Sequence, residues 1–354
     1  MKVSFWLTST TRVMTMNNWG IAPMGGAEIS AVQLGEELLK LDYDVTYYLQ
    51  RCEPFDKGNL HVRLHRQVAE EPQEIFVCVR PHAILTNDFG EGIKKVLWSG
   101  DAFDQTSNNI FFNQPTAKSM TAYVFKSNWQ KEKMLERFFY IPPEKVKVIY
   151  NGVKREFFGI NGIVPNPKRF IHTSTFYRGV HNFLDIWPMI LDEIPDAEIH
   201  VFSKTSLYMG NMDDGKQKAY AELAEKLVHL PNFVLREPIP QYRVAEEMAK
   251  AWLMLYPNSG FVESSCGSVQ QSIAVGTPVI ATKRAGLPET IRENGVLIEQ
   301  NGEGWKEDFA KATIELSKTH PEKREEMAKY GRLRGVQESW EVKAKEWDDF
   351  LRSL

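Results

Sequence analysis

Short apolar runs alternate along the chain with stretches whose apolar residues recur at helical spacing. In the first half, the apolar runs that predict strands are residues 3–7, 45–49, 75–79, 96–98, 123–125 and 146–150. Between them, residues 27–41 and a stretch from Ser127 through Phe139 predict helices, and Ser127 with Gln130 matches a capping box. Strands that alternate with helices favour parallel, doubly wound sheets.

The second half restarts the same alternation. Its predicted strands are residues 170–172, 199–202, 233–235, 253–256, 279–281 and 296–298, and its predicted helices are 183–191, 216–227, 242–251 and 269–275. Residues 154–169, rich in Gly and Pro, predict a linker. From Glu303 onward the chain is charged and helical, and residues 340–354 have no strand after them, so we expect this last helix to cross back onto the first domain.

These patterns predict two doubly wound α/β domains that face each other across a central cleft, where ligands bind at the carboxyl ends of strands. The expected boundaries are residues 1–153, together with the crossover helix at about 340–354, and residues 154–339. A chain of 354 residues is long enough for two such cores.

Composition narrows the class of protein. The chain is 43% hydrophobic and 25% charged, and its 43 Lys and Arg against 46 Asp and Glu give a net charge of −3, which does not favour nucleic acid as a partner. There is no apolar run of membrane-spanning length and no signal-peptide pattern at the N-terminus. Three scattered cysteines suit a reducing compartment, so we expect a cytoplasmic protein.

The most informative stretch is residues 261–279. It begins with Glu263, continues through Ser265, Cys266 and Gly267, and enters the predicted helix. Small residues ahead of a helix leave backbone N–H groups available to an anion. The carboxylate of Glu263 cannot bind the same anion, because like charges repel. A sugar hydroxyl is its natural partner. This loop predicts a ligand with a phosphate end and a polyhydroxy end.

Other residues are weaker candidates by themselves. Arg178-Gly179 follows the first strand of the second half, where a guanidinium could fork onto a diphosphate, although a surface arginine at a helix start fits equally well. Gln271 lies two helical turns beyond the loop, within reach of a ribose diol, or is an ordinary surface glutamine. Asp101 closes a strand and would lie at the cleft rim, or caps a turn.

Gly25-Gly26 precede the first helix, which raises the possibility of a dinucleotide fingerprint. The loop before them is too long for one, and the second strand ends in Gln50-Arg51 where an acid would be needed. The plain alternative is that the glycines let the loop turn. No nucleophile triad, Walker loop, metal-ligand spacing or paired-carboxylate pattern emerges elsewhere.

In order and spacing, several segments resemble the retaining GT-B glycosyltransferases of glycosyltransferase family 4, the group 1 glycosyltransferases. The segments are Gly25-Gly26-Ala27-Glu28, residues 125–129 and 148–153, Arg178-Gly179, residues 261–279 with the signature's first glutamate at Glu263, and residues 285–289. The resemblance implies two Rossmann-like domains, with the acceptor bound by the first and a nucleotide sugar by the second.

By this resemblance, Glu263 and Asp101 would be catalytic. The donor would be bound by Gly25, Gly26, Arg178, Gln271 and the N–H groups near Ser265, Cys266 and Gly267. No metal or other cofactor is expected, because Arg178 and the helix N-terminus would stabilise the developing charge. The partners would be a nucleotide sugar, such as a UDP- or GDP-sugar, and a glycan, lipid-linked or other hydroxyl acceptor; peripheral membrane contact and oligomeric state stay open.

Two positions depart from the family pattern. The second glutamate of the signature is Gln271 and the histidine before Asp101 is Gly100. A neutral hydrogen bond contributes about 0.5–1.5 kcal/mol against about 1.5–3 for a charged one, so we expect weaker nucleotide binding without its loss. The alternatives are a non-catalytic sugar-nucleotide binding protein and a GT-B nucleotide-sugar epimerase or hydrolase.

Overall fold

The computed structural model describes residues 1–8, 12–22, 24–87, 89–203 and 214–354, and these divide into two units. Unit 1 consists of Met1–Gly152 together with Glu338–Leu354, and unit 2 of Val153–Gln337. The chain passes from one unit to the other at Gly152, one residue before the expected boundary, and returns at Glu338. Part of the loop ahead of Gly25 lies outside the described residues.

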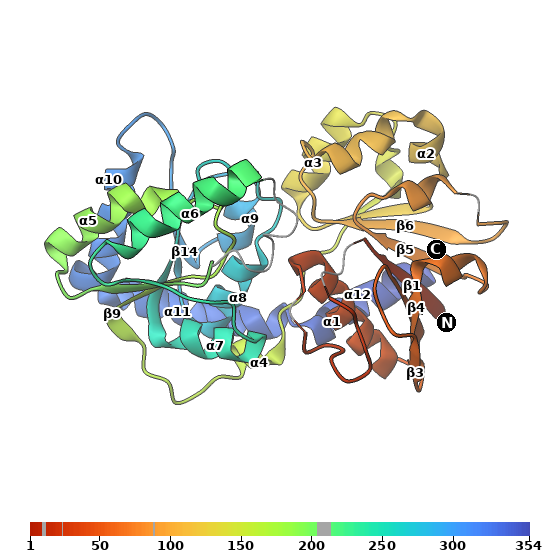
Figure 1. The fold of residues 1–354 in the computed structure, drawn as a ribbon, viewed down its shortest axis with the longest axis horizontal. Coiled ribbons are helices and arrows are strands. Elements are labelled where there is room, and N and C mark those ends of the chain that lie inside the picture. The colour runs from red at the N-terminus through yellow and green to blue at the C-terminus, as the bar shows by residue number, and fades with distance from the viewer. Residues whose placement is uncertain (9–11, 23, 88, 204–213) are drawn as a thin grey trace. The chain divides into compact units, whose positions relative to one another are not determined.

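Unit 1 is built on a sheet that has eight strands among the described residues, in the order β3-β4-β2-β1-β5-β6-β7-β8 (Figure 1). All neighbouring strands in it are parallel except β3 and β4. The strands are β1 Lys2–Leu7, β2 Asp44–Leu49, β3 Phe55–Lys57, β4 Leu60–Leu64, β5 Ile75–Val79, β6 Lys94–Ser99, β7 Ala122–Phe125 and β8 Val146–Val148. The helices are α1 Gly26–Lys40, α2 Gln114–Ser119, α3 Asn128–Arg137 and α12 Trp340–Arg352, with 3-10 turns at His65–Ala69, Ala83–Thr86, Thr106–Phe112 and Pro143–Lys145.

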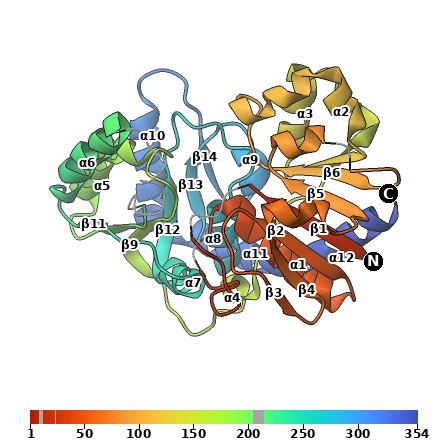
Figure 2. The ribbon, with the colours of Figure 1, turned by 45° about the vertical axis from the view of Figure 1, so that its right-hand side comes forward.

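The C-terminal helix α12 completes the core of unit 1. It lies beside α1 in both views of the ribbon (Figures 1 and 2). Its Trp347 packs edge-on against Trp98 of β6, with ring centroids 4.9 Å apart. A Cβ at Gly152 would come within 2.5 Å of the Trp340 ring, so glycine at this position lets the start of the helix pack against the segment that follows β8. Residues far apart in sequence therefore share one core.

Unit 2 is built on a sheet that has six strands among the described residues, all parallel, in the order β11-β10-β9-β12-β13-β14. The strands are β9 Asn166–His172, β10 Glu198–Val201, β11 Phe233–Leu235, β12 Ala251–Tyr256, β13 Val279–Thr282 and β14 Gly295–Ile298. The helices are α4 Arg155–Phe158, α5 Phe183–Glu193, α6 Asp214–Val228, α7 Gln241–Lys250, α8 Gly267–Val275, α9 Leu287–Ile291, α10 Trp305–Ile314 and α11 Pro321–Gln337, with a 3-10 turn at Val180–Asn182 and a π turn at Glu315–Thr319.

Helices cover both faces of the unit 2 sheet (Figure 2). Apolar residues of α5 and α10 form the core on one face, and those of α4, α7 and α8 form it on the other. Because both faces are covered, strands such as β12 are buried along their whole length, as expected of a parallel sheet.

Strand order reverses once near the centre of each sheet. In unit 1 the chain adds β2 on one side of β1 and later β5 on the other, and in unit 2 it adds β10 on one side of β9 and later β12 on the other. At such a switch point the loops after two neighbouring strands diverge, which leaves room for a ligand at their carboxyl ends. The fold therefore predicts ligand sites in two places: at the loops after β1 and β5 in unit 1, and at the loops after β9 and β12 in unit 2.

Several local predictions were wrong. Residues 154–169 are not an irregular linker, because they contain α4 and the first residues of β9. The hairpin β3–β4 was not predicted, since its strands are short and only partly buried. The helix expected to run through Phe139 ends at Arg137, and the strand expected to reach Tyr150 ends at Val148.

No helix among the described residues is both long and apolar enough to cross a membrane.

Candidate functional site

The loops that follow β9 and β12 bring Arg178 and Glu263 together. Arg178 Nη1 lies 2.8 Å from Oε2 of Glu263 and forms an ion pair with it. The Glu263 residue is only 3% exposed, whereas the Arg178 side chain is 22% exposed. The guanidinium also lies over the ring of Phe261, 4.5 Å from its centroid. The two residues singled out separately in the sequence are direct neighbours in the structure.

A tyrosine that the sequence did not single out completes this pair. The hydroxyl of Tyr256, the last residue of β12, donates to Oε2 of Glu263 over 2.9 Å. Both partners therefore bind the same carboxylate oxygen, and among the described residues no other hydrogen bond reaches the Glu263 side chain. Tyr256 itself stacks on His172, with ring centroids 5.5 Å apart. Oε1 of Glu263 is thus left to accept from a ligand.

Burial governs the protonation of this group. It raises the pKa of Glu263, while Arg178 and the Tyr256 hydroxyl act in the opposite direction. Burial also lowers the pKa of His172 to about 4, so its ring is neutral at ordinary pH. Burial raises the pKa of the Cys266 thiol to about 12, which excludes this residue as a thiolate nucleophile near neutral pH.

Glycines hold the two loops in place. Gly179 has φ +90°, and a Cβ there would lie 2.0 Å from the carbonyl oxygen of Pro257, so only glycine allows the loop after β9 to approach the loop after β12. Gly286 donates its N–H to the carbonyl of Glu263 over 2.7 Å, and a Cβ at this position would lie 2.2 Å from the carbonyl oxygen of Ser264. The segment 285–289 therefore positions the backbone that carries the glutamate.

Two buried asparagines, also missed in the sequence, brace the same loop. Asn182 donates to the carbonyl of Pro257 and to Ser259 Oγ, both over 2.8 Å. Asn258 bonds both the N–H and the carbonyl of Phe261, which closes the turn just before Glu263. In the sequence, Asn258 is marked only by its place just after a predicted strand, and nothing marks Asn182.

Helix α8 begins directly behind this loop. Cys266 is its N-cap residue, and no side chain caps the helix, so the first N–H groups stay available. Ser265 and Gly267 are partly exposed, and a Cβ at Gly267 would meet no atom within 4 Å. Ser268 Oγ donates to the carbonyl of Thr173, which ties the first turn of α8 to the loop after β9. This arrangement can receive an anion beside Arg178.

Gln271 lies on α8, one turn further along. Its Nε2 donates to Oε1 of Gln241 on α7 over 3.3 Å, and the side chain is partly exposed. It is not one of the groups that contact Glu263 or Arg178, and its role toward a nucleotide stays a prediction.

The remaining predicted residues lie in unit 1. Gly25 is the N-cap of α1 and Gly26 its first residue. Neither glycine has a positive φ, so the backbone conformation here does not require glycine. A Cβ at Gly26 would face open space. Asp101 follows β6 and is buried, with Oδ1 3.7 Å from Arg80 Nε and Oδ2 3.4 Å from Ser107 Oγ.

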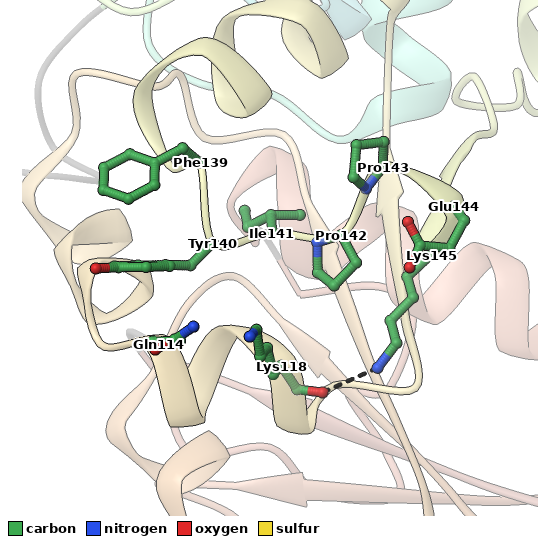
Figure 3. Close-up of a pocket in the computed structure, with 9 residues that line it drawn as sticks. All are labelled: Gln114, Lys118, Phe139, Tyr140, Ile141, Pro142, Pro143, Glu144 and Lys145. Carbon is green, nitrogen blue, oxygen red and sulfur yellow. Dashed lines mark hydrogen bonds between the residues drawn. The ribbon is translucent and has the colours of Figure 1, made fainter.

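A separate hollow lies elsewhere on unit 1. This pocket of about 580 Å³ is lined by Gln114 and Lys118 of α2 and by residues 139–145, and Lys145 Nζ donates to the carbonyl of Lys118 across it (Figure 3). None of the predicted site residues lines this pocket. Within the described part of the chain, no group of three or more His, Cys, Asp or Glu side chains is arranged to hold a metal ion.

Comparison with solved structures identifies the fold. The chain matches solved glycosyltransferases along its whole length, which shows that it has the GT-B fold. The model of the family "Glycosyl transferases group 1" matches residues 167–319, which lie within unit 2.

Three of the similar structures show the extent of the match. WaaG, a glycosyltransferase involved in lipopolysaccharide biosynthesis, is 14% identical, with 98% of this chain and 99% of that chain covered and a TM-score of 0.70. Alr3699/HepE from Anabaena, in complex with UDP and glucose, is 16% identical, with both chains fully covered and a TM-score of 0.75. Sucrose-phosphate synthase from Thermosynechococcus elongatus is 13% identical, with 99% and 98% covered and a TM-score of 0.73. A comparison with curated protein sequences gives no match.

Proposed function

We propose that the protein is a retaining glycosyltransferase that moves a sugar from a nucleoside diphosphate sugar to a hydroxyl acceptor. The observation that carries the proposal is the arrangement around Glu263. Tyr256 and Arg178 fix its Oε2, and its Oε1 is left for a sugar hydroxyl beside the uncapped start of α8. A nucleotide sugar has hydroxyls at one end and phosphates at the other. A carboxylate can accept from the hydroxyls, and a neighbouring cation and helix N–H groups can bind the phosphates.

In the reaction, the bond between the anomeric carbon and the diphosphate oxygen breaks, and a bond forms from that carbon to the acceptor oxygen. The acceptor proton leaves with the diphosphate when departure and attack occur on one face, which retains the configuration. Negative charge grows on the leaving diphosphate, and Arg178 together with the N–H groups of Gly267 and its neighbours would stabilise it. The proposal therefore needs no metal, with Glu263 orienting the donor sugar and Asp101 as the second proposed catalytic residue.

The similar structures guide the choice of donor. HepE has been solved with UDP-glucose and with UDP and glucose, so UDP-glucose is the first donor to test. The proposed acceptor is a glycan, a lipid-linked sugar or another hydroxyl compound, and the proposed compartment is the cytoplasm, which suits the free cysteines Cys52, Cys78 and Cys266.

The experiment is a thermal-shift screen against UDP-, GDP-, ADP- and dTDP-sugars, followed by analysis of the product anomer for any donor that stabilises the protein. A product with the anomeric configuration of the donor supports the proposal, and an inverted product refutes the retaining mechanism. Donor binding without transfer or hydrolysis would instead support the alternative, a non-catalytic sugar-nucleotide binding protein, which the departures at Gln271 and Gly100 keep in view.

A further inference from the structure

Four charged residues meet at the carboxyl end of the unit 1 sheet. Glu28 lies in the first turn of α1, Arg80 directly follows β5, Asp101 follows β6 and Lys126 directly follows β7. Glu28, Asp101 and Lys126 are buried, and Arg80 is the most exposed of the four. They therefore line the end of the sheet where a doubly wound fold binds ligands.

The two carboxylates share one cation. Arg80 Nε lies 3.9 Å from Oε1 of Glu28 and 3.7 Å from Oδ1 of Asp101. Arg80 has φ +73°, a backbone conformation that an arginine rarely adopts and that directs the chain out of β5 at this point. The guanidinium is thus held between the two acids.

Lys126 is different, because its ammonium has no such partner. The residue is 5% exposed, and among the described residues its Nζ forms no hydrogen bond and no ion pair. Nζ lies over the ring of Trp98, 5.0 Å from the centroid. Burial and the nearby Arg80 lower the pKa of Lys126 to about 8, with Asp101 and Glu28 acting in the opposite direction. Since no described side chain accepts from its N–H groups, these donors can bond a ligand oxygen at this end of the sheet.

The backbone around Lys126 is built to hold it there. The buried amide of Gln130 accepts from the N–H of Lys126 over 2.9 Å and donates to the carbonyls of Ser99 and Asp101 over 3.0 and 2.9 Å. One side chain thereby fixes the loops after β6 and β7 to each other. Gly100 provides the room, because a Cβ there would lie 2.9 Å from Cδ of Lys126.

We propose that Lys126 is a substrate-binding residue whose Nζ donates to a hydroxyl oxygen of a sugar ring, while Asp101 accepts from a neighbouring hydroxyl of the same ring. The four side chains carry two positive and two negative charges, so an uncharged polyhydroxy ligand leaves the cluster balanced, whereas a phosphate would not. The inference rests on the proposed function for the presence of a sugar substrate. It leaves open whether the ring belongs to the donor or to the acceptor, and the test separates the two.

The test follows the Cε–Hε signals of a protein labelled with ¹³C-lysine. The signal of Lys126 is the one that is missing from the Lys126→Met variant and that titrates near pH 8. The probes are the nucleotide sugar that gives the largest thermal shift, the matching nucleoside diphosphate alone, and methyl hexopyranosides without nucleotide. Lys147→Met is the matched control, because Lys147 is an exposed lysine of β8 in the same unit.

A shift of the Lys126 signal with the nucleotide sugar but not with the nucleoside diphosphate supports the proposal and places the donor sugar at the site. A shift with the methyl glycosides alone also supports it and places the acceptor there. A shift with the nucleoside diphosphate alone overturns it in favour of an anion site. An unmoved signal in protein that binds its donor overturns it as well. If no nucleotide sugar binds, the proposed function fails, and the methyl glycosides still decide the role of Lys126.

Kinetics give a second readout. Lys126→Met removes a charged hydrogen bond to substrate, so kcat/KM for transfer should fall roughly ten- to hundredfold while nucleoside diphosphate affinity is unchanged. Lys147→Met should match the parent protein. If Lys126→Met fails to fold, Gly100→Ala displaces the lysine side chain without removing its charge, and it should lower kcat/KM in the same direction. Unchanged kinetics in a folded Lys126→Met protein would show that the lysine serves packing only.

Discussion

Replacing Tyr256 with Phe removes a single hydroxyl from the centre of the candidate site. That hydroxyl donates to Oε2 of Glu263 over 2.9 Å, and both side chains are almost fully buried. A hydrogen bond to a charged group contributes about 1.5–3 kcal/mol, so the free energy of unfolding should fall by about this amount. The phenyl ring keeps the stacking on His172, which leaves the hydroxyl as the only group lost.

The same change should alter function. With only Arg178 on Oε2, the carboxylate of Glu263 loses part of its orientation and part of the stabilisation of its charged form, so its pKa rises further. Because about 1.4 kcal/mol corresponds to a factor of ten in rate, turnover of the donor should fall at least about tenfold. The acidic limb of the pH–rate profile should move to higher pH. Denaturant unfolding and steady-state kinetics over a pH series measure both effects.

Tyr43→Phe is the matched control. The Tyr43 hydroxyl donates to Oδ1 of Asp348 over 2.5 Å, and Arg352 Nε donates to the same oxygen over 2.7 Å, so this trio has the same chemistry in unit 1. Its loss should lower stability without changing donor turnover. If Tyr256→Phe also lowered stability but left turnover and its pH dependence unchanged, Tyr256 and Glu263 would be a structural pair, and the assignment of the site would be wrong.

The other predictions concern the charged groups. Glu263→Ala should abolish transfer while the fold survives. Glu263→Gln, which keeps an acceptor for Tyr256, should also abolish transfer but with less loss of stability. Full activity in either folded variant would contradict the assignment of Glu263 to the site. Arg178→Ala should raise the donor KM and lower kcat, and an unchanged donor response removes Arg178 from the site. The pKa of Lys126 in the folded protein, about 8, lies below its ordinary 10.5, so between these values the unfolded chain binds more protons and stability should rise with pH. Lys126→Met should lack this rise in chemical denaturation, and an identical pH dependence would disprove the shift. Transfer should persist in excess chelator, whereas strict dependence on added divalent metal contradicts the proposed stabilisation of the leaving group by Arg178.

Much of the fold could be predicted from the sequence, because local patterns carry it. Apolar runs of three or four residues, separated by stretches of helical spacing, predicted each strand of unit 2 that the described residues contain, within a few residues of the bounds in the structure. The short, partly buried strands β3 and β4 have no such pattern. Helix α4 was not predicted, because it lies in a segment rich in glycine and proline. Order along the chain also did not reveal that β1 and β9 are central strands, since strand pairing depends on contacts between distant segments.

The candidate site divides in the same way. Arg178 and the loop from Glu263 to Gly267 could be chosen from residue type and from their place after predicted strands. Their direct ion pair could not, because Arg178 and Glu263 lie on loops that meet only when β12 pairs with β9. Tyr256 read as one more apolar strand residue, and only the packed sheet shows its hydroxyl turned to the carboxylate.

Lys126 shows the same limit in unit 1. In the sequence it is a lysine between a strand and a helix cap, a position that usually faces water. Tertiary structure buries it, because Gly100 makes room for its side chain and Gln130 binds the loops after β6 and β7 together. The sequence by itself predicted most of the strands and helices, and it singled out residues 261–279 as the loop proposed to bind phosphate and sugar. Only the tertiary structure decided which polar groups are desolvated and which share a partner, since burial and hydrogen bonding are properties of segments brought together from across the chain.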